Sequence, residues 1–383
     1  MLIPQPVLLP LPPGPYQVSS NGLHRLRMAL KTTASLLAEP LHPDTEHFQS
    51  MAVALSLGLE MAETPQGRAA FASLGRLVDE FRAHPTASAA QKAARCASHS
   101  THMDWHVNHF LQSIRTDFPE VIIGSTKLDT PDGLAMAAKQ DWWQGSYNAF
   151  TGKAAGGIFF NSSRVRSMVV AHDTYVWASK AKAPVAQRYL QRWRTFLFMF
   201  ACATLHELAH LFVCYLTRGK SPDTPEGITH LDYSSYLDAE TKQTMPGFES
   251  GRWLENALYG GSLEFIWDDN DDRMQTGIPY LINSSDVAFQ IRRSTIDQFF
   301  ASPRRFAFPF PVHATPISAA EWKWRGLVSV GRYASSLDMP SVTPASVRWM
   351  QARRLDPMYS LDIEELRRAP TAPHVNFTTV PGA

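Results

Sequence analysis

The stretch VAQRYLQRWRTFLFMFACATLHELAHLFVCYLTRG, residues 185–219, is the longest continuous pattern in the chain and decides the fold. It follows Pro184 and ends at Gly219, and both residues are typical helix boundaries. Phenylalanine, leucine and valine occur on most sides of its second half, which predicts a helix buried in the core. That half contains the segment HELAH at 206–210, in which polar side chains interrupt the apolar surface.

His206 and His210 are four residues apart, so on a helix they lie on one face, one turn from each other. Two imidazole nitrogens so placed can bind one zinc ion, at about 2.0–2.1 Å. Glu207 is rotated by about 100° from His206, where it can reach a water molecule on the metal but is badly placed as a ligand. Burial of these three groups would be costly unless something satisfies them, and a metal would do so. The alternative is a chance pattern on a structural helix.

This segment resembles the HExxH helix of the zincin metallopeptidases, here His206-Glu207-Leu208-Ala209-His210. The resemblance implies an upstream edge strand that pairs with an extended peptide, and GGIFFNSS at 156–163 is in position to be that strand. The segment LFVCYLTRG after the motif lacks the third histidine of the metzincins. A distant carboxylate is therefore expected to complete the site.

Two carboxylates in the next predicted helix, within ESGRWLENALYGG, are candidates for the third ligand: Glu249 and Glu255. Their six-residue offset is about 240° around a helix, so they cannot both face the metal. Glu249 precedes the helix start at Ser250-Gly251, where a frayed end is expected, whereas Glu255 lies mid-helix. We therefore expect Glu255 at the metal and keep Glu249 as the alternative. A third possibility is that Glu249 and Glu255 are both ordinary surface or cap carboxylates. The small residues at 250–251 would let this helix approach the histidine helix closely.

The same stretch is similar to the ligand segment of thermolysin-type glutamate zincins, in which Ser-Gly is followed four residues later by the metal-binding Glu. Carried over, that role falls on Glu255. The family's Asn before this Glu is Leu254 here, and its Asp four residues later, which orients a ligand histidine, is Tyr259. The residues that orient the ligands must therefore come from elsewhere. The resemblance covers about residues 155–262.

Arg252 and Tyr259 share a helix face with Glu255, and either can donate a hydrogen bond to an oxyanion. A salt bridge or a packing role is the alternative for both. Three further residues lie in the loop between the two ligand helices, where a lid or a proton donor would be located: His230, Tyr233 and Tyr236.

The composition excludes several classes of protein. The 383 residues include 36 Lys+Arg and 35 Asp+Glu, so a net charge of +1 gives no reason to expect nucleic acid or an anionic membrane as a partner. Three cysteines are no disulfide framework, and Cys202 and Cys214 read as core residues. The amino terminus lacks the basic region of a signal peptide, and the apolar run at 195–216 is too polar for a clean membrane span. We expect a soluble, cytoplasmic protein.

Four regions follow along the chain. A proline-rich extended arm is expected at 1–20, a helical region at 21–117, a zincin-like catalytic region at 118–300, and an extension packed on the core at 301–383. LHRLRMALKTTASLLAE, from residue 23, and SSDVAFQIRRSTIDQFF, from 284, both read as helical. PEVIIGST and AGGIFFNSS read as strands. The expected class is α+β and predominantly helical, a zincin-like core with a small sheet and added helical layers.

The sequence therefore predicts a zinc-dependent hydrolase with Zn²⁺ as its cofactor. His206, His210 and Glu255 would bind the metal, and Glu207 would activate water for attack on an amide or ester carbonyl. A peptide is the expected substrate. A small molecule, handled by a hydrolase or lyase in a biosynthetic route, and a non-catalytic interaction protein with an inert motif are the alternatives. Nothing in the sequence indicates the oligomeric state.

Overall fold

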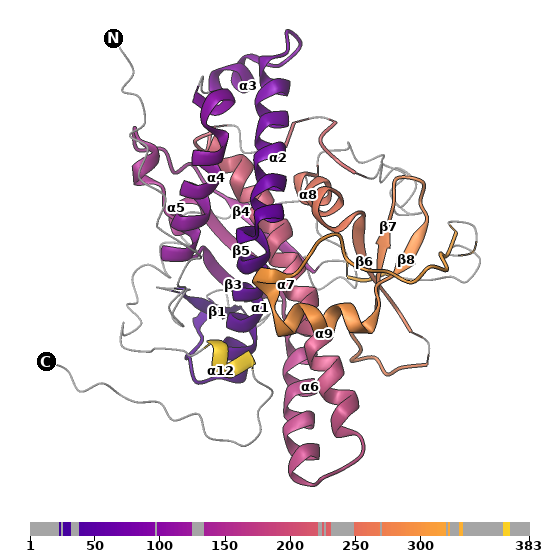
Figure 1. Cartoon of the computed structure of the whole chain (residues 1–383). Coiled ribbons are helices and arrows are strands. Elements are labelled where there is room, and N and C mark those ends of the chain that lie inside the picture. Colours follow the sequence, from indigo (N-terminus) through magenta and orange to yellow (C-terminus); the bar gives the residue numbers. More distant parts are fainter. Residues whose placement is uncertain are drawn as a thin grey trace, which may run out of the picture.

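The computed structural model of the chain describes residues 23, 26–31, 38–95, 98–124, 134–220, 224–225, 227–230, 249–268, 270–318, 321, 329–331 and 363–367. The arm expected at 1–20 and the loop residues Tyr233 and Tyr236 lie outside these ranges. Helices predominate and are accompanied by two sheets (Figure 1), so the predominantly helical α+β class is confirmed.

Helix α7, Ala186–Leu216, is the centre of the fold and confirms the predicted long helix. Every side chain from Thr195 to Leu216 is buried. Helices α1, Glu46–Glu63, and α6, Ser162–Lys180, pack along it. The approach of α1 is very close at Gly58, where a Cβ would lie 2.6 Å from the carbonyl oxygen of Ala201. Helix α6 and the first half of α7 form a hairpin that extends from the rest of the molecule (Figure 1).

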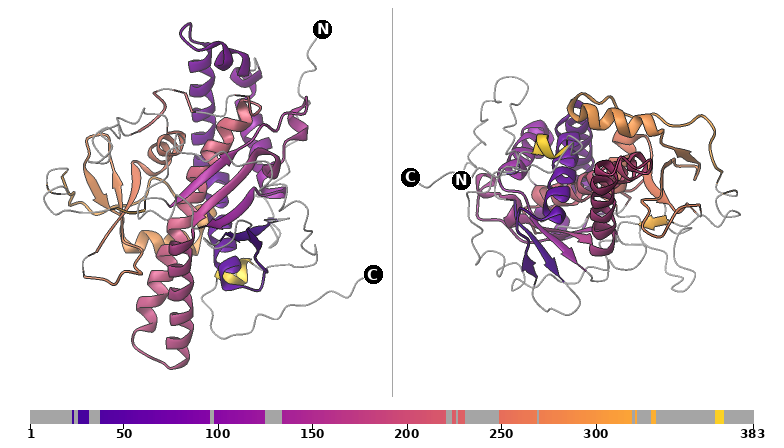
Figure 2. Two further views of the ribbon diagram at one scale, coloured as in Figure 1. Left: turned by 180° about the vertical axis from the view of Figure 1, so that it is seen from behind. Right: turned by 90° about the horizontal axis from the view of Figure 1, so that it is seen from below.

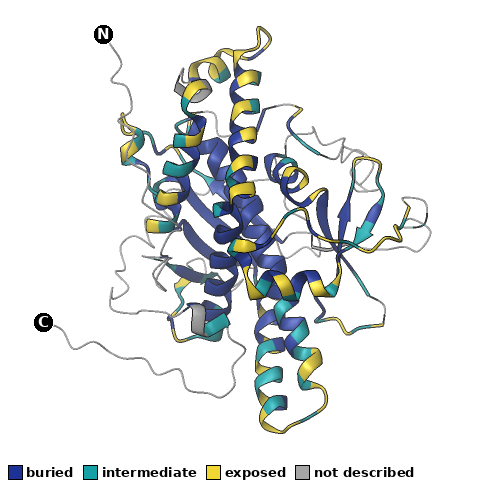
Figure 3. Ribbon diagram, viewed as in Figure 1, coloured by how far each residue is buried: buried dark blue, intermediate teal, exposed yellow. Residues whose placement is uncertain are grey.

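The length and composition of α7 are also those of a membrane-spanning helix, and it is the one such helix among the residues that the structure describes. Its apolar window is, however, entirely buried inside the protein. Figure 3 shows the same contrast: the middle of α7 is buried, whereas the outer face of α2, Pro65–Ala83, carries an exposed stripe. The burial of α7 is that of a core helix in a soluble protein.

A five-stranded sheet lies against α7, with the strand order β2-β1-β3-β5-β4. The strands are β1 Met28–Lys31, β2 Glu39–Pro40, β3 Glu120–Gly124, β4 Ala135–Lys139 and β5 Gly156–Asn161. Strands β1, β3 and β5 are parallel, whereas β2 and β4 are antiparallel to their neighbours. Seen from behind, this sheet crosses α7, and the second sheet lies on the other side of the helix (Figure 2).

The structure corrects the expectation that residues 156–163 form an edge strand. Residues Gly156–Asn161 form β5, which pairs with β3 on one side and with β4 on the other. The edge position beside α7 belongs instead to β4, whose sequence AMAAK contains no β-branched or aromatic residue and so gives no strand signal. The helix expected from residue 23 is also wrong over Met28–Lys31, because this segment pairs with β3 and forms β1.

A second group of elements lies beside α7 and begins with helix α8, Ser250–Tyr259, which confirms the predicted helix. Gly260 ends α8 in the left-handed conformation, φ 87°. A four-stranded sheet of order β8-β7-β6-β9 follows, which the sequence reading did not anticipate. Its strands are β6 Ser262–Ile266, β7 Ile278–Ile282, β8 Ala288–Gln290 and β9 Ser329–Gly331. The helix expected over 284–300 is therefore wrong in its first part, which is β8, and only α9, Arg293–Ala301, is helical.

Helices α2 and α4, Ser98–Thr116, pack against α7, and α3, Ala89–Ala94, packs on α2. The short helices η2 Tyr147–Ala149 and α5 Gly152–Ala155 lie between β4 and β5 in sequence. In the carboxyl-terminal region, η4, Pro303–Arg305, precedes the buried Phe306 and Phe310. Helix α12, Ile363–Arg367, packs on α1, where Arg367 pairs with the buried Glu60.

Candidate metal centre

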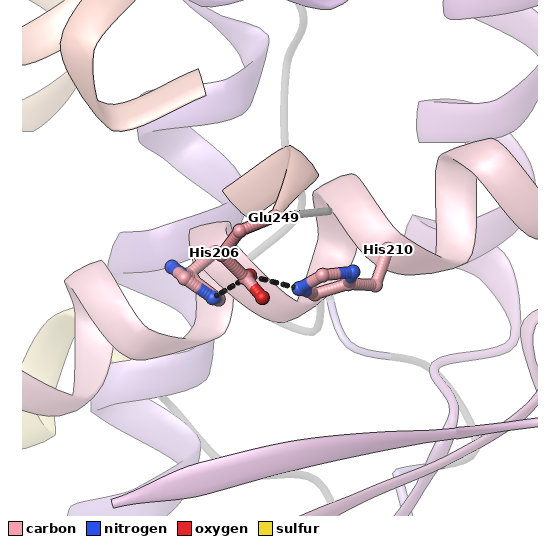
Figure 4. A group of neighbouring side chains, drawn as sticks. All are labelled: His206, His210 and Glu249. Atoms are coloured by element: carbon pink, nitrogen blue, oxygen red, sulfur yellow. Dashed lines mark hydrogen bonds and ion pairs between the residues drawn. The ribbon is translucent and has the colours of Figure 1, made fainter. Parts of the chain in front are cut away.

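Two elements bring three potential ligands together. Helix α7 carries His206 and His210 on one face, and Glu249 is the N-cap residue of α8 (Figure 4). Oε1 of Glu249 lies 2.8 Å from Nε2 of His206 and 2.5 Å from Nε2 of His210. One ligand atom from each residue falls within 4.8 Å of the others, so the three can share one ion.

The donor set fits zinc. Two imidazole nitrogens and a carboxylate oxygen are ligands that zinc takes in catalytic sites, with a further position left for water. The ligand side chains are shielded, since the histidines are 0% and 5% exposed and Glu249 is 12% exposed. A negative carboxylate placed between two inward-facing nitrogens occupies the region where a cation would be held.

The opposite nitrogens of both rings are also fixed. Nδ1 of His206 lies 2.9 Å from Oε1 of Glu255, and Nδ1 of His210 lies 3.0 Å from Oγ of Ser250. Thr224 donates a hydrogen bond to Ser250 Oγ at 2.9 Å. Because a carboxylate only accepts, Nδ1 of His206 carries a proton, which would leave the Nε2 lone pair for a metal. This is the arrangement that metal-binding histidines need, and it orients both rings toward Glu249.

The structure therefore reverses the order in which the sequence ranked the two glutamates. Glu249 faces the Nε2 atoms, whereas Glu255, expected as the third ligand, orients His206 from behind. The end of α8 is not frayed at Glu249: its amide donates to the carbonyl of Ile228 at 2.9 Å, and its own carbonyl accepts from Trp253 at 3.0 Å. The positive end of the α8 dipole also favours a carboxylate at this position.

Gly251 explains how α8 comes close enough. A Cβ built on Gly251 would lie 2.3 Å from Nε2 and 2.3 Å from Cδ2 of His206, so only glycine fits against this ring. The expectation that small residues at 250–251 allow a close approach of the two helices is confirmed. The glycine thereby places Glu249, two residues earlier, beside the histidines.

Glu207 points to the other side of the cluster, toward the edge strand β4. Its Oε2 accepts a hydrogen bond from the amide of Ala137 at 2.6 Å, and its Oε1 is buried with no hydrogen-bond partner among the described residues. Burial raises the pKa of Glu207 above its ordinary value, and the neighbouring histidines only partly oppose this. A carboxylate with one anchored oxygen, one unused oxygen and a raised pKa is suited to taking and returning a proton.

The charges of the cluster are coupled. Burial lowers the pKa of His206, but its contacts with Glu249 and Glu255 outweigh burial and raise that pKa to about 9. Burial likewise opposes ionisation of Glu249, yet the two histidines hold its pKa well below the ordinary value. For Glu255, burial is outweighed chiefly by Arg252, and its pKa is also lowered. Without a metal, the cluster thus holds both carboxylates ionised beside a protonated imidazole.

Arg252 contacts Glu255 and supports the cluster through that residue. Its guanidinium donates to Oε2 of Glu255 at 3.2 Å, to Oε1 of Glu264 at 2.6 Å and to the carbonyl of Leu263 at 2.7 Å. The Leu263 amide also donates to Glu255 Oε2, at 2.9 Å. The guanidinium of Arg252 is therefore engaged in a buried ion-pair network on the far side of His206, which is the salt-bridge alternative and not the oxyanion role.

The other predicted helpers lie outside the cluster. The hydroxyl of Tyr259 faces the sulfur of Met61 at 3.9 Å, and its ring stacks on Phe310. Nδ1 of His230 lies 2.9 Å from Ser262 Oγ. Cys202 and Cys214 are buried, as expected of core residues.

Sequence reasoning missed two partners of the cluster. The backbone amide of Ala137 was missed because β4 gives no strand signal, and amides carry no side-chain signature. The hydroxyl of Ser250 was treated only as a small residue, although its position next to Glu249 could have suggested a contact with the second histidine. Comparisons of the chain with protein-family models, with curated proteins and with solved structures found no match.

Proposed function

We propose that this protein is a zinc-dependent hydrolase of the zincin type, with His206, His210 and Glu249 as the metal ligands. The observation that carries the proposal is the convergence of both Nε2 atoms on Glu249 Oε1, with Glu207 on the same buried segment of α7. A bound zinc ion would supply Lewis-acid activation of a water molecule and of the substrate carbonyl. The resident side chains would do the rest.

Glu207 is proposed as the general base. Its unused Oε1 would take the proton from the attacking water, and its raised pKa would let it hold that proton until the leaving group accepts it. The hydrogen bond from Ala137 keeps Oε2 anchored, so the carboxylate turns one oxygen toward the reaction. Glu255 and Ser250 would keep the histidine rings in position during the reaction.

The edge strand β4 is proposed as the surface that aligns the substrate. Asn161 donates to the carbonyl of Leu134 and Gln140 donates to the carbonyl of Ala155, so the even-numbered residues of β4 pair with β5. The odd-numbered residues, Ala137 among them, direct their amides and carbonyls away from β5. Because Glu207 holds the amide of Ala137, an extended chain could pair with the other groups of this edge, which favours a peptide as the substrate. A cytoplasmic location is part of the proposal.

The test is a pair of matched Glu→Gln variants. Glu207→Gln keeps the shape of the side chain but removes the base, and it is expected to retain zinc while cleavage of a peptide library falls by about 10²–10⁴-fold. Glu80→Gln, on the exposed face of α2, should leave both zinc content and turnover unchanged. Turnover of Glu207→Gln equal to that of the unmodified protein would contradict the role of Glu207. A zinc-loaded protein that cleaves no peptide would favour a small-molecule substrate.

A further inference from the structure

A buried arginine at the end of α2 has no hydrogen-bond partner among the residues that the structure describes. Arg82 lies in the last turn of α2 and is 1% exposed. Its Nε and both terminal nitrogens are buried, and none of them donates a hydrogen bond within the described part of the chain. Leaving the five N–H groups of a guanidinium unused in the interior is unfavourable, so a site of this kind indicates a missing acceptor.

The nearest carboxylate does not fill that role. Asp79 is one turn before Arg82 on α2, but Arg95 approaches both of its oxygens, with Nε 3.3 Å from Oδ1 and a terminal nitrogen 3.4 Å from Oδ2. Burial lowers the pKa of Arg82 to about 10, so the side chain is still charged at neutral pH. Asp79 acts on Arg82 through its charge but accepts no hydrogen bond from it.

A second unused donor lies at the same end of α7. Cys214 and Tyr147 are, after Asp79, the titratable side chains that lie near Arg82. Cys214 is one turn beyond His210, and its thiol donates to the carbonyl of Gln140 at 3.5 Å. Nε2 of Gln140 is buried, also with no hydrogen-bond partner in the described chain. Cys214 thus contacts the main chain of Gln140, and both Arg82 and the Gln140 side chain keep unused donors in this part of the fold.

The neighbouring groups neither accept from Arg82 nor supply charge. Trp142 Nε1 donates to the carbonyl of Cys214 at 3.3 Å, and the hydroxyl of Tyr147 donates to the carbonyl of Leu216 at 3.3 Å. Burial lowers the pKa of His106 to about 3 and that of His109 to about 4, so both rings are neutral at pH 7. On the α7 side, the surroundings are thus aromatic and uncharged, and they strengthen the attraction of Arg82 for an anion.

We propose that Arg82 binds a carboxylate group near the carboxyl-terminal end of α7. The planar fork of the guanidinium matches the two oxygens of a carboxylate. A single negative charge balances the charge of the Arg82 guanidinium, whereas a phosphate dianion would exceed it. This site is separate from the metal centre and does not depend on hydrolysis.

The experiment is thermal unfolding of metal-free protein with increasing acetate at constant ionic strength. Acetate is expected to raise the melting temperature of the unmodified protein. The response should weaken at least about tenfold in Arg82→Met, since a charge-assisted hydrogen-bonded pair is lost. Arg76→Met, an exposed residue of the same helix that pairs with Asp104, is the matched control and should respond normally. If Arg82→Met does not fold, Arg82→Lys, which keeps the charge but loses the fork, should show a weakened response.

Three outcomes would overturn the proposal: no effect of acetate on the unmodified protein, the same effect in Arg82→Met, or a larger effect of inorganic phosphate than of acetate. A further comparison distinguishes two sources of the carboxylate. Preferential binding of peptides with a free carboxyl terminus over amidated ones, lost in Arg82→Met, assigns the carboxylate to the substrate. Acetate binding without that preference assigns it to a separate small ligand. Neither reading requires turnover, so failure of the hydrolase proposal leaves this test intact.

Discussion

Glu255 holds His206 by its Nδ1 atom at a distance of 2.9 Å, with 0% of either side chain exposed. This contact fixes both the tautomer and the direction of the ring, so that Nε2 faces Glu249. The two glutamates of α8 therefore have different parts in the same site, one behind the ring and one in front of it.

The two glutamates should differ in their effect on metal affinity. Glu255→Gln keeps a hydrogen-bonding partner for Nδ1 but loses the negative charge, and it is expected to weaken zinc binding by about 10–100-fold. Glu249→Gln replaces a proposed ligand with a poorer one and should weaken zinc binding more than Glu255→Gln does. Competition with a zinc-sensitive dye measures both constants. A larger loss for Glu255→Gln than for Glu249→Gln would restore Glu255 as the third ligand.

Gly251→Ala should disable the site without touching a ligand. The new methyl group would fall 2.3 Å from the His206 ring, so the ring or the helix must move. We expect zinc affinity to drop by more than about tenfold, because a shift of the ring misplaces Nε2. Gly124→Ala is the control, since a Cβ there meets its nearest atom at an ordinary 3.6 Å. Unaltered zinc affinity in Gly251→Ala would argue against His206 as a ligand.

The buried histidines of α4 predict a loss of stability in acid. Burial, and then His109 and His102, lower the pKa of His106 to about 3, whereas its unfolded value is near 6.5. Below about pH 6.5, His106 therefore binds a proton in the unfolded chain but not in the folded chain, and the free energy of unfolding falls as the pH falls toward 3. This one group should cost about 2 kcal/mol between about pH 7 and pH 5.

Urea unfolding of His106→Asn checks this prediction. The carboxamide can still meet the hydroxyl of Tyr215, which lies 3.2 Å from Nδ1 of His106, but it does not titrate. The loss of stability between about pH 7 and pH 5 should be smaller in the variant by about 2 kcal/mol. An unchanged pH dependence would show that His106 is protonated in the folded protein.

Much of this fold can be read from the sequence where one pattern dominates. The long apolar helix α7 and the strands β3 and β5 carry strong periodic or β-branched signals, and α8 has a clear end at Gly260. Strands β1 and β4 could not be predicted, because MALK and AMAAK favour a helix or no structure and become strands only by pairing with neighbours.

The candidate site, like the fold, could be predicted only in part. The i, i+4 spacing of His206 and His210 was enough to predict that the two rings share a face. The choice between Glu249 and Glu255 depended on how α8 approaches α7, which is decided by the contact of Gly251 with His206 and by the backbone bond from Glu249 to Ile228. Both are contacts between segments distant in sequence, and helical spacing alone gave the less suitable glutamate.

Metal content tests the central claim most directly. The protein and its His210→Ala and Glu207→Gln variants would be stripped, reloaded with zinc, freed of excess metal and analysed by mass spectrometry. We predict one zinc ion per chain in the unmodified protein and in Glu207→Gln, and almost none in His210→Ala. Absence of bound zinc from the unmodified protein, or equal zinc in His210→Ala, would contradict the metal centre and the hydrolase proposed on it.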